Sequence, residues 1–206
     1  MILERVCVGE LEVNCYVVAG DGSPAAVVID PGSEKDKIAK VLAKHKLKAV
    51  AVINTHGHID HIGCDDDFGV PVYCSEKDAK LLKDSRLNLS GFLSSPFSVK
   101  SAITQLKDNQ VISLAGIEFK VIHTPGHTPG GICLLVKDEA RYVLFSGDSL
   151  FRSSVGRSDF EGADGEALIN SIKERLLVLP DETVVYPGHG PATTIGYEKE
   201  HNPFLV

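Results

Sequence analysis

Four apolar segments of this chain each run directly into a glycine-containing turn that carries a histidine or an aspartate. They are AVAVINTHGHIDH at 49–61, FKVIHTPGH at 119–127, YVLFSGD at 142–148 and VVYPGH at 184–189. In layered α/β proteins the loops at one end of the strands share one rim, so these four ends can meet. Such a meeting would place seven polar side chains in one cluster: His56, His58, Asp60, His61, His127, Asp148 and His189.

The remaining pattern predicts strands and helices that alternate in two similar halves. Strands are expected at 11–19, 25–30, 48–54, 70–74, 116–123, 131–136, 141–147 and 183–188. Helices are expected at 33–45, capped by Ser33, at 75–84, capped by Ser75, at 164–179, and in a short C-terminal segment that Pro203 ends. The alternation favours a single α/β domain over residues 1–206, with helices outside packed sheets.

Composition excludes several classes of protein. A hydrophobic content of 43% supports a buried core, and a net charge of -7 argues against binding of nucleic acid. No apolar stretch approaches the roughly 20 residues of a membrane span. The five cysteines form no Cys-x-x-Cys pair and the N-terminus lacks the pattern of a signal peptide, which predicts a cytoplasmic protein.

The predicted cluster is typical of a metal centre. Five imidazoles and two carboxylates packed together without a cation would be costly, and both groups are ligands for zinc, iron and manganese. Seven ligand groups exceed the about four that a tetrahedral zinc accepts, so two divalent ions are implied, zinc being the first expectation. A carboxylate can bridge two ions because it has two oxygens. His45, His123 and His201 lie outside the strand ends and are expected to be ordinary hydrogen-bonded residues.

The motifs THGHIDH, GHTPGG, SGDSLF and PGHG, in this order, resemble those of the metallo-β-lactamase superfamily. GDSLFRSSVGRSDF and TTIGYEKEHNPF most resemble its glyoxalase II-like branch. The resemblance implies a four-layer αββα sandwich with a dinuclear site at one edge. It assigns His56, His58 and His127 to the first metal, Asp60, His61 and His189 to the second, and Asp148 to both. It also implies that Thr55, Gly57, Gly126, Gly188 and Gly190 shape the loops, and that Asp30 either supports a ligand or makes a turn.

Such a centre predicts hydrolysis by metal-bound hydroxide, with Asp60 among the catalytic groups and no protein nucleophile. A small-molecule thioester fits because a thiolate leaves with little help from a general acid, and the sequence offers no obvious separate acid. The resemblance to the glyoxalase II-like branch implies S-lactoylglutathione or a related acyl thioester as the substrate.

Two arginines are candidates for substrate binding, and the glutathione pocket of the family is only partly retained. Arg157 occupies the position of the family's glutathione-contacting lysine, while Asp159 replaces a tyrosine, and only 17 residues follow His189, so the family's helical C-terminal domain is not expected. Arg152 and Arg157 could bind an acidic substrate, or Arg157 could pair with Asp159.

The sequence leaves other functions open. Persulfide dioxygenases resemble this chain but use one iron, and zinc β-lactamases commonly present a cysteine where this chain has Asp148. A structural or metal-storage site without activity is a third reading, although a structural zinc usually has a closed shell of four ligands. Residues 84–102, with Phe92, Leu93 and Phe97, could form either a lid over the site or a long surface loop.

Overall fold

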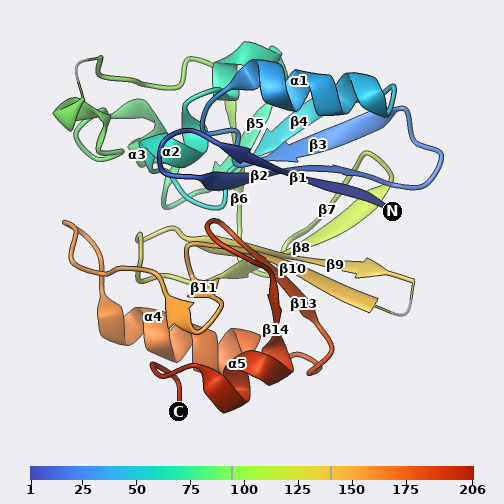
Figure 1. The fold of residues 1–206 in the computed structure, drawn as a ribbon. Coiled ribbons are helices and arrows are strands. Elements are labelled where there is room, and N and C mark those ends of the chain that lie inside the picture. Colours follow the sequence, from blue (N-terminus) through green and yellow to red (C-terminus); the bar gives the residue numbers. More distant parts are fainter. Residues whose placement is uncertain (94, 140) are drawn as a thin grey trace.

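Two six-stranded sheets form the centre of the computed structural model, which describes residues 1–93, 95–139 and 141–206 (Figure 1). The first sheet has its strands in sequence order: β1 (Ile2–Val8), β2 (Val13–Ala19), β3 (Ala25–Ile29), β4 (Lys48–Ile53), β5 (Val72–Ser75) and β6 (Ile103–Leu106). Its first three strands pair antiparallel, whereas β3, β4, β5 and β6 run parallel. Parallel strands send their carboxyl ends to the same edge, which brings the segments after β3 and β4 together.

The second sheet has the order β14-β13-β10-β9-β8-β7. Its strands are β7 (Val111–Leu114), β8 (Ile117–His123), β9 (Ile132–Asp138), β10 (Arg141–Gly147), β13 (Val184–Pro187) and β14 (Thr193–Thr194). A small hairpin of β11 (Leu150–Phe151) and β12 (Ser154–Val155) follows β10. Strands β10 and β13 are parallel neighbours, so the turns that follow them lie side by side.

Helices cover the outer face of each sheet, which gives four layers (Figure 1). On the first sheet lie α1 (Lys35–Lys44), α2 (Ile59–Ile62) and α3 (Ala79–Lys83). The short 3-10 helix η1 (Asp65–Phe68) follows α2, and η2 (Ser90–Phe92) follows α3 in the segment that projects at the left of Figure 1. On the second lie α4 (Gly165–Ser171), its π-helical continuation η3 (Ile172–Leu176), and α5 (Ile195–His201). The arrangement confirms the predicted αββα sandwich.

Strand β2 shows why the layers form. Its seven residues VNCYVVA are all buried, because alternate side chains enter different cores. Cys15 and Val17 pack with Ile38 of α1, while Tyr16 and Val18 pack between the sheets against residues such as Phe119 and Phe145. A third core joins the second sheet to α4, η3 and α5 through Leu144, Leu168 and Ile172, among others. Each apolar face therefore has a partner layer.

Most expected elements are present, but both expected serine caps are wrong. The residue before α1 is Glu34, in a left-handed conformation with φ 51° and no side-chain capping bond, and Ser33 lies outside the helix. Ser75 ends β5, and α3 begins only after Asp78. In both places the residue before the helix uses its carboxylate in a tertiary contact: Glu34 accepts from the Gly9 N–H, and Asp78 accepts from the Gly57 and Gly130 N–H groups.

Several short or edge strands were not predicted from the sequence: β1, β6, β7, β11, β12 and β14. Strand β1 buries only Val6 and Val8 and exposes or half-exposes its other residues, so its apolar pattern is weak. Within the described part of the chain, every helix is too short or too polar to cross a bilayer.

Candidate metal centre

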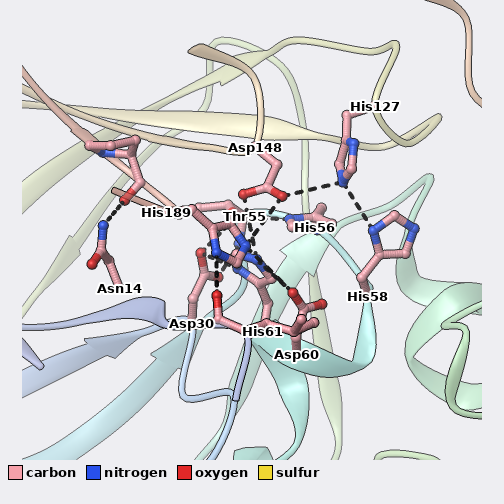
Figure 2. Close-up of polar contacts among 12 residues, drawn as sticks. Asn14, Asp30, Thr55, His56, His58, Asp60, His61, His127, Asp148 and His189 are labelled. Carbon is pink, nitrogen blue, oxygen red and sulfur yellow. Dashed lines mark hydrogen bonds and ion pairs between the residues drawn. The ribbon is translucent and has the colours of Figure 1, made fainter. Parts of the chain in front are cut away.

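The structure brings all seven side chains of the predicted cluster together at one edge of the sandwich (Figure 2). The segment between β4 and the end of α2 supplies four of them from the first sheet. The second sheet supplies the other three, one after each of β8, β10 and β13. We call these seven residues the ligand cluster: His56, His58, Asp60, His61, His127, Asp148 and His189.

Three overlapping groups within the ligand cluster have the geometry to hold a metal ion. Each group offers one ligand atom per residue, and in each group those atoms lie within 4.8 Å of one another. The groups are His56, His58 and His127; His56, His61 and Asp148; and Asp60, His61 and His189. The first and third are the two sets that the family resemblance assigned to separate metals, and the second connects them.

Asp148 lies between the two sets. Its Oδ2 is 3.6 Å from His127 Nε2 on one side and 3.6 Å from His189 Nε2 on the other. Its Oδ1 is 3.5 Å from His61 Nε2. Because this carboxylate faces imidazoles of both sets, it has the position that a bridging ligand requires (Figure 2).

Partners outside the ligand cluster orient four of the imidazoles. His127 Nδ1 lies 2.7 Å from the Arg157 carbonyl, and His189 Nδ1 lies 2.9 Å from the Leu11 carbonyl. A carbonyl only accepts, so both Nδ1 atoms donate and both Nε2 atoms keep a lone pair directed inward. His56 Nδ1 lies 3.2 Å from Thr55 Oγ1, and His61 Nδ1 lies 3.1 Å from Asp30 Oδ2, a charge contact without hydrogen-bond alignment.

Asp30 supports two ligands at once and also makes a turn. Its carboxylate accepts from the Thr55 backbone N–H and from Thr55 Oγ1, each at 2.7 Å. Since the Thr55 hydroxyl proton points to Asp30, its oxygen is free to accept from His56 Nδ1. Asp30 is 1% exposed and has a left-handed φ of 52°. These contacts with Thr55 and His61 favour the first of the two readings that the sequence left open for Asp30.

The second sheet's turn that carries His189 is fastened to the first sheet by Asn14. The Asn14 side-chain amide donates to the carbonyls of Pro187, at 2.9 Å, and Gly190, at 2.8 Å (Figure 2). Gly188 in this turn packs against the ligand cluster, because a Cβ there would overlap Asp148 Oδ1 and lie 2.8 Å from His61 Cε1. The turn thus needs a glycine for close approach.

Asp78 joins the two loops that carry the first set, a role that sequence reasoning missed. Its buried carboxylate accepts from the Gly57 N–H at 3.0 Å, between His56 and His58. It also accepts from Thr128 Oγ1 at 2.8 Å and from the Gly130 N–H at 2.6 Å, next to His127. In the sequence, Asp78 falls in the first turn of the helix expected at 75–84, where an aspartate is common without any role in a site.

A test of metal binding comes from buried atoms without partners. Among the described residues, His56 Nε2, His61 Nε2 and Asp148 Oδ1 are buried and have no hydrogen-bond partner. Leaving such atoms unpaired is costly, and all three point into the ligand cluster. Imidazole nitrogen and carboxylate oxygen are donors that divalent metals accept, so the residues fit a metal centre.

The electrostatics lead to the same conclusion. Burial, followed by the neighbouring His127, lowers the pKa of His58 to about 3, and burial with His61 lowers the pKa of His56. These two imidazoles are therefore neutral at neutral pH, the form that binds metal. Burial would also lower the pKa of His61, but Asp148, Asp60 and Asp30 outweigh it and raise that pKa to about 10. The carboxylates thus attract positive charge strongly, as a cation site must.

A cavity of about 760 Å³ opens onto the ligand cluster. His58, Asp60, His127, Asp148 and His189 form its floor. Its other lining residues are mostly apolar: Leu11, Ile59, Leu89, Phe92, Leu93, Phe151, Ser154, Val155, Arg157 and Phe160. A small molecule in this cavity would contact the candidate metal centre on one side and apolar side chains on the others.

The two arginines expected to bind substrate are both engaged with protein groups. Arg157 lines the cavity, but its Nε and Nη2 donate to the two oxygens of Asp159, each at 2.7 Å, and its guanidinium lies 4.1 Å from the Phe160 ring centroid. Arg152 is outside the cavity lining, and its guanidinium lies 5.1 Å from the Tyr197 ring centroid. The pairing with Asp159 is the second of the two readings given above for Arg157.

Residues 84–102 border the cavity in part; residue 94 lies outside the described residues. Phe92 is 86% exposed and Leu93 54% exposed, whereas Phe97 packs against the first core.

The other three histidines have ordinary partners away from the ligand cluster. His45 contacts Glu4, His123 contacts the Pro129 carbonyl, and His201 contacts the Tyr197 carbonyl.

Comparison with known proteins identifies clear relatives. A family model described as the metallo-beta-lactamase superfamily matches residues 8–189, a range that includes the whole ligand cluster. Hydroxyacylglutathione hydrolase GloC of Haemophilus influenzae is 35% identical over 212 residues, which cover 100% of this chain and 98% of that protein.

Two solved structures are similar over the whole chain. The crystal structure of BLEG-1 B3 metallo-beta-lactamase is 39% identical with a TM-score of 0.91, covering 100% of both chains. The crystal structure of TTHA1623 in a di-iron-bound form is 39% identical with a TM-score of 0.83, covering 98% of this chain and 100% of that one.

Proposed function

Because the chain belongs to the metallo-beta-lactamase superfamily, we propose that it is a dinuclear metal-dependent hydrolase that cleaves S-lactoylglutathione or a related acyl thioester. The observation that carries the proposal is the position of Asp148 between two sets of imidazoles. The description of the Haemophilus influenzae relative as a hydroxyacylglutathione hydrolase supports the thioester.

The proposed ligands follow the two outer groups of the cluster. His56, His58 and His127 would hold one ion, and Asp60, His61 and His189 the other. Asp148 would bind both. Zinc is our first choice, because imidazole and carboxylate suit it, while the di-iron form of a 39% identical relative makes iron the main competitor.

Two divalent ions would supply an activated water at neutral pH and would polarise the carbonyl under attack. The remaining tasks fall to the chain. Asp60 lines the cavity, and burial would raise the pKa of its carboxyl, but His61 and His189 outweigh burial and lower it. Asp60 is thus ionised: its Oδ2, 3.5 Å from His189 Nε2, would hold the second ion, and we assign its other oxygen as the acceptor of a hydrogen bond that orients the attacking water.

A thioester suits the lining of the cavity. Among the described lining residues, the side chains outside the floor are apolar except for Ser154 and the paired Arg157. None of these is an evident proton donor for a poor leaving group. A thiolate leaves without such a donor, whereas an amine does not.

The test combines metal content with turnover. Purified protein reconstituted with excess zinc, iron or manganese should contain two ions per chain by elemental analysis. It should hydrolyse S-lactoylglutathione or a neutral acyl thioester without consuming oxygen. One ion per chain after reconstitution, with oxygen consumed in the presence of a persulfide, would replace this proposal with the dioxygenase.

A second candidate, β-lactam hydrolysis, is favoured by the likeness to BLEG-1 B3 metallo-beta-lactamase. Benzylpenicillin and a carbapenem should therefore be assayed beside the thioesters. Turnover of a β-lactam with a higher kcat/KM than every thioester would make it the primary activity. The third reading, a metal site without catalysis, requires two bound ions and no turnover of any of these substrates.

For the cellular location of the protein, we propose the cytoplasm, where its five free thiols would stay reduced.

A further inference from the structure

We propose that the cavity beside the metal centre binds an uncharged, apolar acyl group, so that the preferred substrates are thioesters of medium-length aliphatic or aromatic acids. The inference rests on the proposed thioester hydrolysis and names the substrate class. It differs from the expectation of an acidic substrate that Arg152 and Arg157 raised.

The first observation is a gathering of exposed apolar side chains at the cavity mouth. Leu11 is 65% exposed, Phe92 86% and Leu93 54%, and all three line the cavity. Single exposed hydrophobic residues are common, but several that line one concave site mark a binding surface.

The second observation is that the apolar surfaces face the centre from two separate parts of the chain. One, which we call the apolar wall, consists of Leu89, Phe92 and Leu93. The opposite wall consists of Phe151, Val155 and Phe160, from the β11–β12 hairpin and the segment after it. In Figure 1 the segments after α3 and before α4 both project on the left side of the molecule. An acyl group between them would lose water on both faces.

The apolar wall is fixed relative to the ligand cluster. The Ile59 N–H, between His58 and Asp60, donates to the Asn88 carbonyl at 2.9 Å. The Asn88 side-chain amide donates to the Phe97 carbonyl at 3.0 Å, and the Phe97 N–H donates to Ser90 Oγ at 2.8 Å. These bonds tie the base of the wall to the metal loop and leave Phe92 free to contact a ligand.

The third observation concerns charge. The described residues that line the cavity outside its floor include one cation, Arg157. Its Nε/Nη2 edge binds Asp159, and its flat face lies over Phe160. The Asp159 carboxylate partly offsets the charge that Arg157 presents to a substrate carboxylate, whereas an uncharged group needs no opposite charge in the cavity. Common biological thiols are polar or charged, so the apolar part of a thioester is its acyl group.

The experiment uses the metal-loaded protein and acyl thioesters of one neutral thiol, N-acetylcysteamine, from acetyl to octanoyl. We expect kcat/KM to rise about threefold for each of the first added methylenes, somewhat less than full burial of a CH₂ would give. The kcat/KM for S-lactoyl-N-acetylcysteamine should be close to that for the acetyl compound. A flat or falling series would overturn the inference while leaving thioester hydrolysis intact.

Two variants locate the effect. Phe92→Ser should lower the ratio of octanoyl to acetyl kcat/KM about tenfold, which corresponds to partial burial of a phenylalanine. Val178→Ser, at a residue that is 70% exposed and is not among the cavity-lining residues, is the matched control and should leave kcat/KM for both thioesters unchanged. An unchanged ratio in Phe92→Ser, or a selective loss of S-lactoylglutathione turnover in Arg157→Ala, would contradict the assignment.

A binding measurement separates this inference from the proposed reaction. Calorimetry with the thioethers S-ethyl- and S-octyl-N-acetylcysteamine should show tighter binding of the octyl compound by tenfold or more, and Phe92→Ser should reduce that difference. If the octyl compound binds more tightly but no thioester is hydrolysed, the apolar site stands and the proposed reaction fails. Equal affinities would overturn the apolar site.

Discussion

The ligand cluster at the floor of the cavity and the apolar wall above it are stabilised in different ways. At the floor, Nδ1 of His127 and of His189 each has a carbonyl partner, and Asp30 and Asp78 bind the surrounding backbone. On the wall, Phe92 is 86% exposed, and the hydrogen bond from the metal loop is made at the base of the segment, at the Asn88 carbonyl. Polar groups without partners are costly, whereas an exposed phenylalanine costs the fold little. Substitutions at the floor should therefore affect stability and metal binding, and substitutions on the wall should affect only ligand preference.

The largest effect is expected at Asp148, which contacts both sets of imidazoles. Asp148→Ala should lose at least one ion per chain and more than about a hundredfold in activity, since even residues that only support ligands cost 10 to 100-fold. Elemental analysis and thioester turnover measure both. His45→Ala, whose imidazole contacts Glu4 instead, is the control and should match the wild type. Retention of both ions and full activity in Asp148→Ala would refute the bridging assignment.

A substitution at Asp78 tests whether the hydrogen bonds beneath the floor of the cavity contribute to stability and metal binding. Asp78→Ala leaves three donors without their acceptor: the N–H groups of Gly57 and Gly130 and the Thr128 hydroxyl. We expect the free energy of unfolding to fall by about 3 kcal/mol, and metal affinity about tenfold or more. Denaturant unfolding and competition with a metal chelator give the two values. Glu76→Ala, two residues away on the surface, should change neither.

Asp65, behind the floor, gives a prediction about pH. Burial raises the pKa of its carboxyl well above the ordinary value. The folded state therefore binds this proton more tightly than the unfolded state, and stability falls as pH rises above the unfolded value of about 3.9. Asp65→Asn removes that loss of stability. The melting temperature of the variant minus that of the wild type should therefore increase between pH 4 and pH 8, by about 2 to 4 °C for each kcal/mol of stability that the substitution restores.

The neighbouring Asp66 is the matched control for Asp65 and should show the opposite slope. Partial burial would raise the pKa of Asp66, but hydrogen bonds from the Ser101 and Lys100 N–H groups outweigh it and lower that pKa. Its contribution to stability is present at neutral pH and lost as pH falls through the folded value. Asp66→Asn should therefore be destabilised at pH 7 and approach the wild type in acid. Parallel pH profiles for the two variants would contradict both assignments.

The smallest effect is expected on the apolar wall. Phe92→Ser should leave the free energy of unfolding within about 0.5 kcal/mol of the wild type, because the side chain contributes little buried area. Phe119→Ala, at a phenylalanine that is 0% exposed, should cost about 3 to 5 kcal/mol. Thermal and denaturant unfolding of the two variants compare them directly. A large loss in Phe92→Ser would mean that the wall belongs to the core.

Sequence patterns alone favoured an α/β domain with helices outside packed sheets and selected the seven residues that the structure brings together, whereas the four-layer αββα sandwich was implied by the resemblance of the motifs to a known superfamily. The α/β class and the seven residues depend on information that is local: apolar runs specify strands, glycine turns end them, and imidazole and carboxylate are recognisable as ligand groups wherever they occur. Local patterns did less well at helix starts. The Ser33 and Ser75 caps were wrong: the helices begin after Glu34, whose carboxylate accepts from the distant Gly9 N–H, and after Asp78, whose carboxylate accepts from the distant Gly57 and Gly130 N–H groups.

Tertiary structure alone decided how those seven residues are held and what surrounds them. Asp78 binds Gly130 and Asp30 binds Thr55, contacts between residues 52 and 25 positions apart that leave no periodic signal in the sequence. The same holds for the cavity, where Leu11, Phe92 and Phe160 come from separate segments. Residue type cannot show whether Arg157 faces a substrate or Asp159, because a guanidinium binds either carboxylate. Only the folded structure shows that the Asp159 carboxylate lies 2.7 Å from Arg157 Nε.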